Sequence, residues 1–381
     1  MRKNRRKVAK ERESLHFKRR NFCYSRFSKA FPMKPLLGHS SGATLNWRKS
    51  GRIDPACQSA TTNHDVAVLM AVYNGARFLG QQVESIIQQS YAQHLHIYVR
   101  DDGSTDGSAQ LLLDIQSRFP GKITIVEDED CNLGIIGNFQ RLMECASESE
   151  ADYFMFADQD DFWFPDKVAV TLAKMQQTEQ QSGAITPTLI HTDLCVAGAN
   201  LEIIDASFWH YEHLHPARSA IQQLCMQNTV TGCTVMINRP LLEKSLPMPL
   251  DVITHDWWLA LIASTSGVVR FVPRATMLYR QHGNNDTGAK HFDFAYMIQS
   301  IRRFAKQQLF WTTLKRHQDQ ASALIKRCGD DLSTTDFARL RNFVSLTKNC
   351  STNVRVTTIF RLGFTRHGII RNIVLFIKLV F

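Results

Sequence analysis

The chain has 381 residues, which exceeds one typical domain without requiring two full hydrophobic cores. Its charge is distributed unevenly. The whole sequence carries a formal net charge of +10, but residues 1–52 hold 16 Lys and Arg against two Glu, a net of +14, so that residues 53–381 sum to −4. The basic balance therefore belongs to the N-terminal arm and says nothing about the rest of the chain.

Residues 1–63 are predicted to form a basic, disordered arm. Ser, Gly, Arg and Lys dominate this segment, which has no repeat, no nucleic-acid-binding motif and no apolar core of a secretory signal. The alternatives are that its basic clusters contact anionic lipid or nucleic acid, or that translation starts at Met33. We favour a disordered leader and expect no nucleic-acid partner.

The nine cysteines include no Cys-x-x-Cys pair, and their number is odd. Several of them fall in apolar segments. This pattern predicts reduced thiols in a cytosolic protein, and it argues against a disulfide framework and against a zinc site.

From Asp65 onward, predicted strands and helices alternate. Four strands are predicted: Val66–Val72, a second one that contains Leu95, Ile97 and Val99, a third at Ile123–Val126, and a fourth that begins at Tyr153. Three helices are predicted between them: one with an apolar stripe from Phe78 to Tyr91, one at Ala109–Phe119 and one that begins at Asn138. This order predicts a mostly parallel, three-layer α/β domain.

Acidic clusters follow two of these strands. Asp158, Asp160 and Asp161 end the apolar run from Tyr153, and the stretch 101–107 ends the second strand. Carboxyl ends of parallel strands meet at one edge of a sheet, where open α/β folds bind ligands. A hard divalent cation that holds a diphosphate would compensate such charge. The alternative is an acidic turn before a helix N-terminus.

Several segments in order resemble the motifs of family 2 glycosyltransferases with the GT-A fold. They are Ala71–Gly75, Asp101–Asp106, Asn132–Gly134, Asp158–Trp163 and Pro165–Lys167. Later segments are similar to the bacterial rhamnosyltransferase-like branch: His191–Asp193, Ser207–Trp209, Asn228–Cys233, His255–Trp258 and Tyr279–Asn284. The resemblance covers residues 65–288. It implies a GT-A domain at 64–290, with a mostly parallel central sheet flanked by helices. The residue pattern of 291–381 separately predicts a helical C-terminal region with a basic amphipathic tail.

The resemblance assigns nucleotide binding to three residues near the first two strands. It places the ring of Tyr73 against the nucleobase. It implies that Asp102 accepts the imide N–H of uracil or thymine, with Asp101 shaping the same loop. A UDP- or dTDP-sugar is therefore the expected donor.

The resemblance also assigns the diphosphate and metal site. It places Asp158 and Asp160 near the ribose and diphosphate, and it makes Asp160, Asp161 and His282 metal ligands for Mn²⁺ or Mg²⁺. Which pair forms the Asp-x-Asp motif depends on the register. A lone histidine is more often structural, and imidazole suits Mn²⁺ better than Mg²⁺. Arg280 is a weaker candidate for contact with a phosphate.

Asp256 is the expected catalytic residue. In the family, an acidic residue at this point removes the proton of the acceptor hydroxyl, and a single displacement inverts the anomeric centre. Many relatives carry Glu-Asp here, whereas this chain has His255-Asp256. The alternative is a capped helix with two buried tryptophans.

After about residue 290 the pattern becomes helical, with a stripe from Phe294 to Leu309 and a second helix at Thr335–Thr347. In the tail, Val354–Phe381, large apolar residues alternate with basic ones, and no uncharged run approaches the roughly 20 residues of a membrane span. This pattern predicts a segment in the interface of an anionic bilayer. The alternative is a final helix that packs on the domain or on a partner subunit.

Together these features predict a cytosolic enzyme at the inner face of the cell membrane. It would be an inverting, metal-dependent glycosyltransferase that moves a sugar, with rhamnose suggested by the resemblance, to a surface-polysaccharide acceptor such as O-antigen or capsule, lipid-linked or not. The alternative from another class is a non-catalytic scaffold with the same fold, docked to membrane or nucleic acid through its basic termini.

Overall fold

The computed structural model describes residues 65–128, 132–249, 251–283 and 307–380. They belong to one compact unit, residues 58–381. The predicted disordered arm, residues 1–63, and the predicted domain boundary at residue 290 lie outside the described residues, and so does most of the predicted stripe from Phe294 to Leu309.

One half of the sheet is parallel. Strand β1 (Val66–Val72) lies between β2 (Leu95–Asp101) and β4 (Tyr153–Asp158), and β3 (Ile123–Ile125) flanks β2. The register aligns Val72 with Asp101 and Ala71 with Asp158. Because the three strands end level with one another, both acidic clusters lie at the same edge of the sheet.

The other half of the sheet is mixed. Strand β8 (Val235–Asn238) is antiparallel to β4 and to β6 (Thr188–Ala197); β9 (Val268–Arg280) is parallel to β6; and the short strands β7 (Ile203–Asp205) and β5 (Phe162–Trp163) add antiparallel edges. The sheet as a whole is therefore mixed, with parallel pairing among β1–β4 and between β6 and β9, whereas the other pairs are antiparallel. An apolar run shows that a strand is buried, but it does not show whether the strand runs parallel or antiparallel to its neighbours. The sequence pattern therefore did not determine the strand directions in this half of the sheet.

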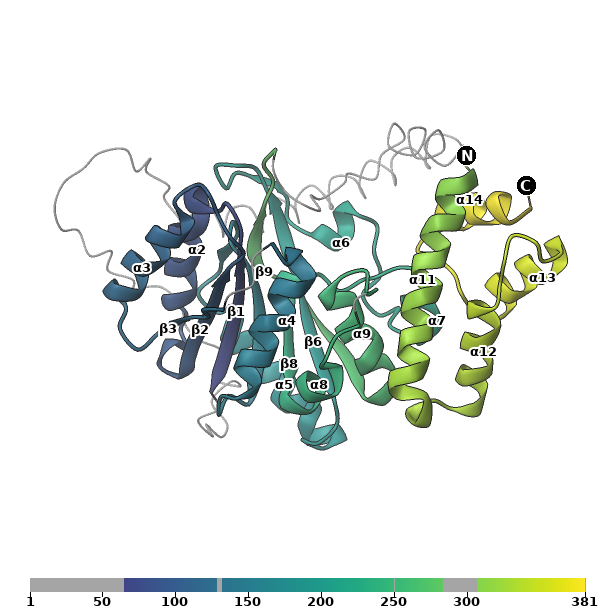
Figure 1. Cartoon of the computed structure of the whole chain (residues 1–381), viewed down its shortest axis with the longest axis horizontal. Coiled ribbons are helices and arrows are strands. Elements are labelled where there is room, and N and C mark those ends of the chain that lie inside the picture. The colour runs from purple at the N-terminus through teal and green to yellow at the C-terminus, as the bar shows by residue number, and fades with distance from the viewer. Residues whose placement is uncertain (1–64, 129–131, 250, 284–306, 381) are drawn as a thin grey trace, which may run out of the picture. The chain divides into compact units, whose positions relative to one another are not determined.

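Helices cover both faces of the sheet (Figure 1). On one face, α2 (Ala76–Ile87), α3 (Ser108–Arg118) and α5 (Lys167–Ser182) share a core with alternate residues of β1 such as Val68 and Met70. On the other, α4 (Gly134–Ser147), α8 (Arg239–Ser245) and α9 (His255–Ser266) pack over Ala67 and Leu69. Strand β1 is thus buried on both sides, as its unbroken apolar sequence predicts.

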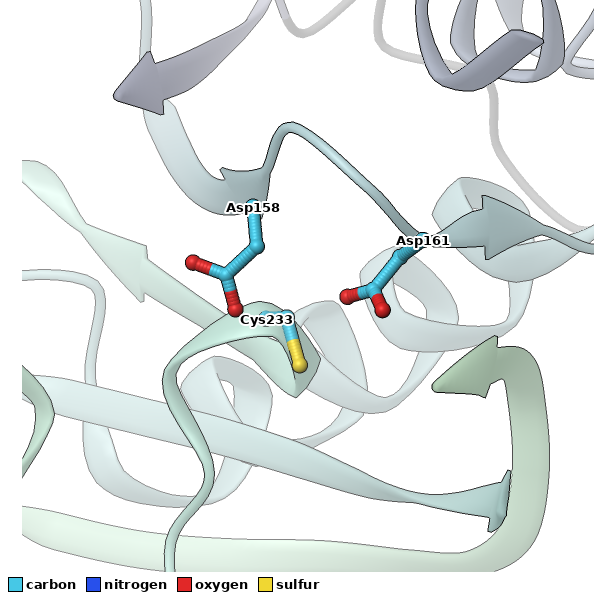
Figure 2. Close-up of side chains that lie close together, drawn as sticks. All are labelled: Asp158, Asp161 and Cys233. Atoms are coloured by element: carbon cyan, nitrogen blue, oxygen red, sulfur yellow. The ribbon is translucent and has the colours of Figure 1, made fainter. Parts of the chain in front are cut away.

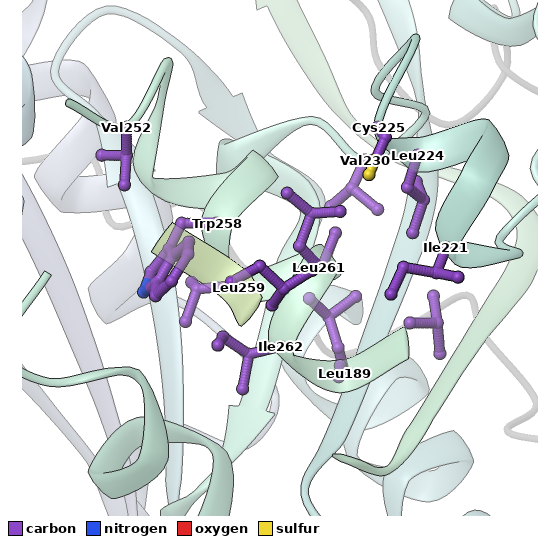
Figure 3. Close-up of a cluster of buried hydrophobic side chains, with 14 of the residues drawn as sticks. Leu189, Ile221, Leu224, Cys225, Val230, Val252, Trp258, Leu259, Leu261 and Ile262 are labelled. Carbon is purple, nitrogen blue, oxygen red and sulfur yellow. The ribbon is translucent and has the colours of Figure 1, made fainter. Parts of the chain in front are cut away.

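Helix α9 is embedded in the larger core. Its residues Trp258, Leu259, Leu261 and Ile262 contact a cluster that includes Leu189 of β6 (Figure 3). Trp258 is fully buried, and its indole N–H donates to the carbonyl of Ser245 at 3.0 Å. A helix held in this way presents its first turn in a defined position.

The C-terminal region is helical, as predicted. It consists of α11 (Gln307–Cys328), α12 (Thr334–Val344), α13 (Thr352–Val356), a π-helical turn at Thr357–Arg361 and α14 (Ile369–Val380). The predicted helix Thr335–Thr347 corresponds to α12. Arg327 of α11 donates to the carbonyls of Leu246 and Pro247, at 2.5 and 2.6 Å, which ties this region to the α/β domain.

The remaining elements are short. They are η2 (Ala92–His94), α6 (Phe208–Tyr211), α7 (Ile221–Leu224), η3 (Gly232–Thr234) and η4 (Gly329–Asp331). Among the helices that the structure describes, none is both long enough and apolar enough to cross a bilayer.

Candidate active site

The turn after β4 is anchored to the end of β1 by Gln159. The backbone N–H of Tyr73 donates to Oε1 of Gln159, and Nε2 of Gln159 donates to the Tyr73 carbonyl, both at 2.9 Å. The side chain of Gln82 donates to the carbonyl of Asp158 at 3.0 Å. The acidic turn is therefore held beside Tyr73, whose side chain is 51% exposed.

Asp158 and Asp161 converge on the thiol of Cys233. One ligand atom from each of the three residues lies within 4.8 Å of the others, and Figure 2 shows the three side chains pointing toward one another. Asp161 is fully buried; its Oδ1 accepts from the backbone N–H of Arg280 at 3.1 Å, and no N–H or O–H of the described residues donates to its Oδ2. Burial and the nearby carboxylates of Asp160 and Asp158 raise the pKa of Asp161 well above its ordinary value.

Asp160 points in another direction, toward the end of β9. Its Oδ2 lies 2.6 Å from Nε2 of His282, and both side chains are mostly buried. The ring of His282 also packs against Phe78, with 4.9 Å between the ring centroids. The three residues expected as metal ligands are thus divided: Asp160 and His282 form a pair, and Asp161 faces Cys233.

These residues fit a bound divalent cation. No N–H or O–H of the described residues donates to the buried Oδ2 of Asp161, and the pKa of the Cys233 thiol is also raised, by burial and by the carboxylates of Asp161 and Asp158. Excess negative charge in a buried site is stabilised by a cation. Carboxylate oxygens are the donors that Mg²⁺ and Mn²⁺ prefer, and a single imidazole is compatible with Mn²⁺.

Arg280 ties the acidic turn to its neighbours. Its guanidinium donates to the carbonyls of Asp160 and Ala199 and to Oε1 of Gln81, each at 2.6 Å, and it lies 4.3 Å from the ring centroid of Phe78. Three of its donors are therefore occupied by protein acceptors. Arg280 therefore supports the turn, and its contact with a phosphate stays a prediction.

Asp102, the expected pyrimidine-binding residue, is buried and fully engaged. Its Oδ1 accepts from Arg100 at 2.8 Å and from the backbone N–H of Leu133 at 2.9 Å, and its Oδ2 accepts from the N–H of Gly134 at 2.8 Å. These bonds fix the start of α4 at Gly134, four residues before the predicted start at Asn138. With three donors on its two oxygens, this carboxylate keeps some capacity to accept a further hydrogen bond, chiefly at Oδ2.

Asp101 has a smaller, local role. It is the last residue of β2, and its carboxylate accepts from both the backbone N–H and the hydroxyl of Ser104. It therefore shapes the loop after β2, as expected.

Asp256 lies in the first turn of α9, and its Oδ1 is already bound. The hydroxyl of Thr254 and the backbone N–H of Trp257 donate to it at 2.5 and 2.6 Å. Gly232 packs against this turn so closely that a Cβ there would lie 2.8 Å from Nε2 of His255 and 3.6 Å from Cβ of Asp256. Because Cys233 follows Gly232, one short turn joins Asp256 to the acidic group.

His255 is buried beneath Asp256. Its ring stacks on Phe139 with 3.9 Å between centroids, and neither ring nitrogen has a hydrogen-bond partner in the described residues. Burial lowers the pKa of His255, against an opposing effect of Asp256. The imidazole is therefore neutral and packs as an aromatic ring.

Sequence reasoning gave no role to Cys233 or Lys167. Lys167 is fully buried, with its ammonium 4.8 Å from the ring centroid of Trp163 and 3.3 Å from Oγ1 of Thr276. Burial lowers the pKa of Lys167 to about 8, although the acidic groups of Cys233 and Asp161 favour its charged form. Cys233 ends the motif Asn228–Cys233 and Lys167 ends the motif Pro165–Lys167. Their place in these motifs was the only sign in the sequence that they belong to the site.

Comparison with known proteins found a matching family model and several similar chains. The model of the family "Glycosyl transferase family 2" matches residues 67–237. The dTDP-rhamnosyl transferase RfbG of Shigella flexneri is 28% identical over 229 residues, which cover 58% of this chain and 74% of the relative. An uncharacterized glycosyltransferase of Haemophilus influenzae is 23% identical over 247 residues, covering 62% and 72% of the two chains. The solved structure of S. aureus TarS 1-349 aligns with a TM-score of 0.48 at 11% identity, covering 78% of this chain and 72% of that one.

The matched residues run from β1 to β8 and include the acidic turn and the Gly232–Cys233 turn. The helix-flanked sheet and the helical C-terminal region are those expected for the GT-A fold. This chain is a glycosyltransferase of the GT-A fold that carries a glycosyl transferase family 2 domain at residues 67–237 and resembles the rhamnosyltransferases of that family.

Proposed function

We propose that this enzyme transfers a sugar from a UDP- or dTDP-linked donor to a surface-polysaccharide acceptor, such as O-antigen or capsule, with inversion of the anomeric centre. The observation that carries the proposal is the Gly232–Cys233 turn. It brings the first turn of α9, with Asp256, against the group formed by Asp158, Asp161 and Cys233. A base and a diphosphate site side by side are what a direct displacement requires.

The donor end is assigned to the first two strands. The exposed ring of Tyr73 would stack on the nucleobase, and Asp101 and Asp102 would shape and read the pyrimidine pocket. Asp158 and Asp160 would lie by the ribose and diphosphate. The name of the Shigella relative supports a dTDP-sugar, with rhamnose as the sugar.

Asp160, Asp161 and His282 are the proposed metal ligands, for Mn²⁺ or Mg²⁺. Their support is the 2.6 Å contact of Asp160 with His282 and the buried Oδ2 of Asp161, to which no N–H or O–H of the described residues donates. When bound, the cation would stabilise the negative charge that builds on the departing nucleoside diphosphate.

Asp256 is the proposed general base. Thr254 and the N–H of Trp257 hold its Oδ1, and no donor within the described residues reaches Oδ2, which leaves this oxygen to take the proton. As the acceptor hydroxyl loses its proton to Asp256, its oxygen forms the bond to the anomeric carbon. The bond from that carbon to the phosphate oxygen breaks, and the electron pair leaves with the nucleoside diphosphate.

The test is Asp256→Asn in the full-length enzyme. We expect kcat to fall by about 10²- to 10⁴-fold, the usual contribution of a general base. Binding of UDP or dTDP, measured by calorimetry with and without Mn²⁺, should be unchanged. CDP and GDP serve as comparison nucleotides.

Full turnover by Asp256→Asn would contradict the assignment of the base. Failure of the folded wild-type protein to bind any of the four nucleotides would instead contradict the donor site and favour a scaffold.

A further inference from the structure

Helix α14 is apolar on two sides, and only one of them is covered. Leu375 and Leu379 are 3% and 0% exposed and pack into the core. A second stripe lies on the outer side: Ile369, Ile370, Ile373, Phe376 and Ile377, with exposures from 43% to 79%. Five of the thirteen large apolar side chains that are exposed in the described part of the chain thus belong to this one helix. Its spacing of i, i+1, i+4, i+7 and i+8 makes them a continuous stripe.

A groove runs beside this stripe. It has a volume of about 580 Å³, and its apolar lining comes from Phe360, Ile369, Ile373 and Phe376. Arg218 also lines it; its guanidinium donates to Oγ1 of Thr365 at 2.8 Å and to the carbonyl of Arg366 at 3.4 Å. An apolar trough with one cationic side chain is suited to an amphiphile that carries a negative head group.

The charge of the segment has a single sign. Residues 351–380 contain five basic side chains, Arg355, Arg361, Arg366, Arg371 and Lys378, and no Asp or Glu. A nearby carboxylate, Glu212 in the loop after α6, lies 4.0 Å from Arg371. A second copy of the same surface would bring like charges together around the apolar stripe, so the charge disfavours self-association.

We propose that the outer face of α14 is a docking surface for an anionic lipid bilayer. The stripe from Ile369 to Ile377 enters the interface between head groups and acyl chains, the basic side chains of residues 351–380 meet lipid phosphates, and the groove receives one acyl chain beside Arg218. Burial of apolar area and attraction to anionic lipid act together in such helices. The inference concerns a surface outside the nucleotide site and does not rest on the proposed function.

Deletion of residues 354–381 is a poor test of this surface. The deletion would remove Ile359, Phe364, Leu375 and Leu379, all of which are buried in the core. Loss of binding could then report unfolding alone. Substitutions on the exposed stripe avoid this problem because the side chains that they change contribute little to the core.

The experiment is sedimentation of the full-length protein with phosphatidylcholine vesicles, with and without phosphatidylglycerol. The test variant is Ile373→Ser with Phe376→Ser. The matched control is Leu113→Ser with Ile185→Ser, two large apolar side chains that are 49% and 87% exposed elsewhere on the surface. We expect the test variant to need at least about tenfold more lipid for half-maximal binding, from the lost apolar burial, and the control to match the wild type. Arg361→Gln should weaken binding by about fivefold, and only with anionic vesicles.

Three results would overturn the proposal. The wild type could fail to bind phosphatidylglycerol vesicles. The test variant could bind as well as the wild type, which would place the contact elsewhere, for example in the basic N-terminal arm. Sedimentation velocity could show a dimer that the two serines abolish, which would make a second copy the occupant. Circular dichroism and thermal unfolding of each variant check its fold without nucleotide, so failure of the docking proposal stays separate from failure of the proposed function.

Discussion

Nε2 of His282 lies 2.6 Å from Oδ2 of Asp160, although 122 positions separate the two residues. The end of β9 brings them together. Its last residue, Arg280, donates its backbone N–H to Asp161 at 3.1 Å and its guanidinium Nε to the carbonyl of Asp160 at 2.6 Å. Two residues later, the chain places an imidazole directly on the acidic turn. This contact gives the sharpest test of the metal site.

His282→Ala should weaken the Mn²⁺-dependent binding of UDP by at least about tenfold, because even residues that only orient metal ligands have effects of this size. Asp160→Asn should have a similar or larger effect. Calorimetric titration with UDP, at fixed Mn²⁺ and in EDTA, measures the change. His213→Ala, on an exposed side chain, is the control. If both variants bind UDP as tightly as the wild type in Mn²⁺, neither residue is a ligand.

Gly232→Ala should impair turnover more than donor binding. The added Cβ would lie 2.8 Å from Nε2 of His255, so the first turn of α9 must shift and Asp256 with it. A displacement of this kind can lower kcat by roughly 10²-fold, while KM for the donor changes little. Gly80→Ala in α2 is the matched control, because its Cβ would meet nothing within 4 Å. Wild-type kcat in Gly232→Ala would show that the proposed base does not depend on this packing.

Asp102→Asn should destabilise the protein and should also weaken its preference for a nucleotide with uracil or thymine as the nucleobase. The carboxylate is buried against Arg100, whose pKa is raised above its usual range, chiefly by Asp128 and also by Asp102. Removal of one partner of a buried ion pair costs on the order of 3 kcal/mol. Chemical unfolding measures this loss, with exposed Asp114→Asn as control. If the ratio of UDP to CDP affinity does not change, Asp102 supports the loop without reading the base.

Stability should fall as the pH is lowered below about 6.5, partly through three buried histidines. Burial lowers the pKa of His191, His317 and His367 to about 3. Between that value and 6.5 the unfolded chain binds protons that the folded chain does not, so each histidine contributes stability at neutral pH that is lost as the pH falls.

His191→Leu isolates one of these contributions. We expect the slope of the unfolding free energy between pH 6 and pH 5 to decrease by about 1.4 kcal/mol per pH unit relative to the wild type. Urea unfolding at several pH values measures the slope, and exposed His213→Leu is the control. An unchanged slope would mean that His191 becomes protonated in the folded protein.

The sequence by itself indicated the family and the strand that ends in the acidic turn of Asp158, Asp160 and Asp161, but it gave no role to Cys233. These features are local: an unbroken apolar run such as Val66–Val72 predicts a buried strand, and Asp158, Asp160 and Asp161 follow one another in the chain. The helical C-terminal region was also readable, because apolar residues recur there at helical spacing.

Tertiary structure alone decided which of these residues meet. Strand direction in the mixed half of the sheet, the division of the acidic residues between His282 and Cys233, and the placement of Gly232 against Asp256 all depend on contacts between residues far apart in the chain. The same holds for α14, where the sequence shows apolar and basic residues but not which side faces the core. Only packing against the domain separates buried Leu375 and Leu379 from exposed Ile373 and Phe376. Local patterns carry the propensity of a segment, whereas pairing between distant segments is set by the free energy of burying them together.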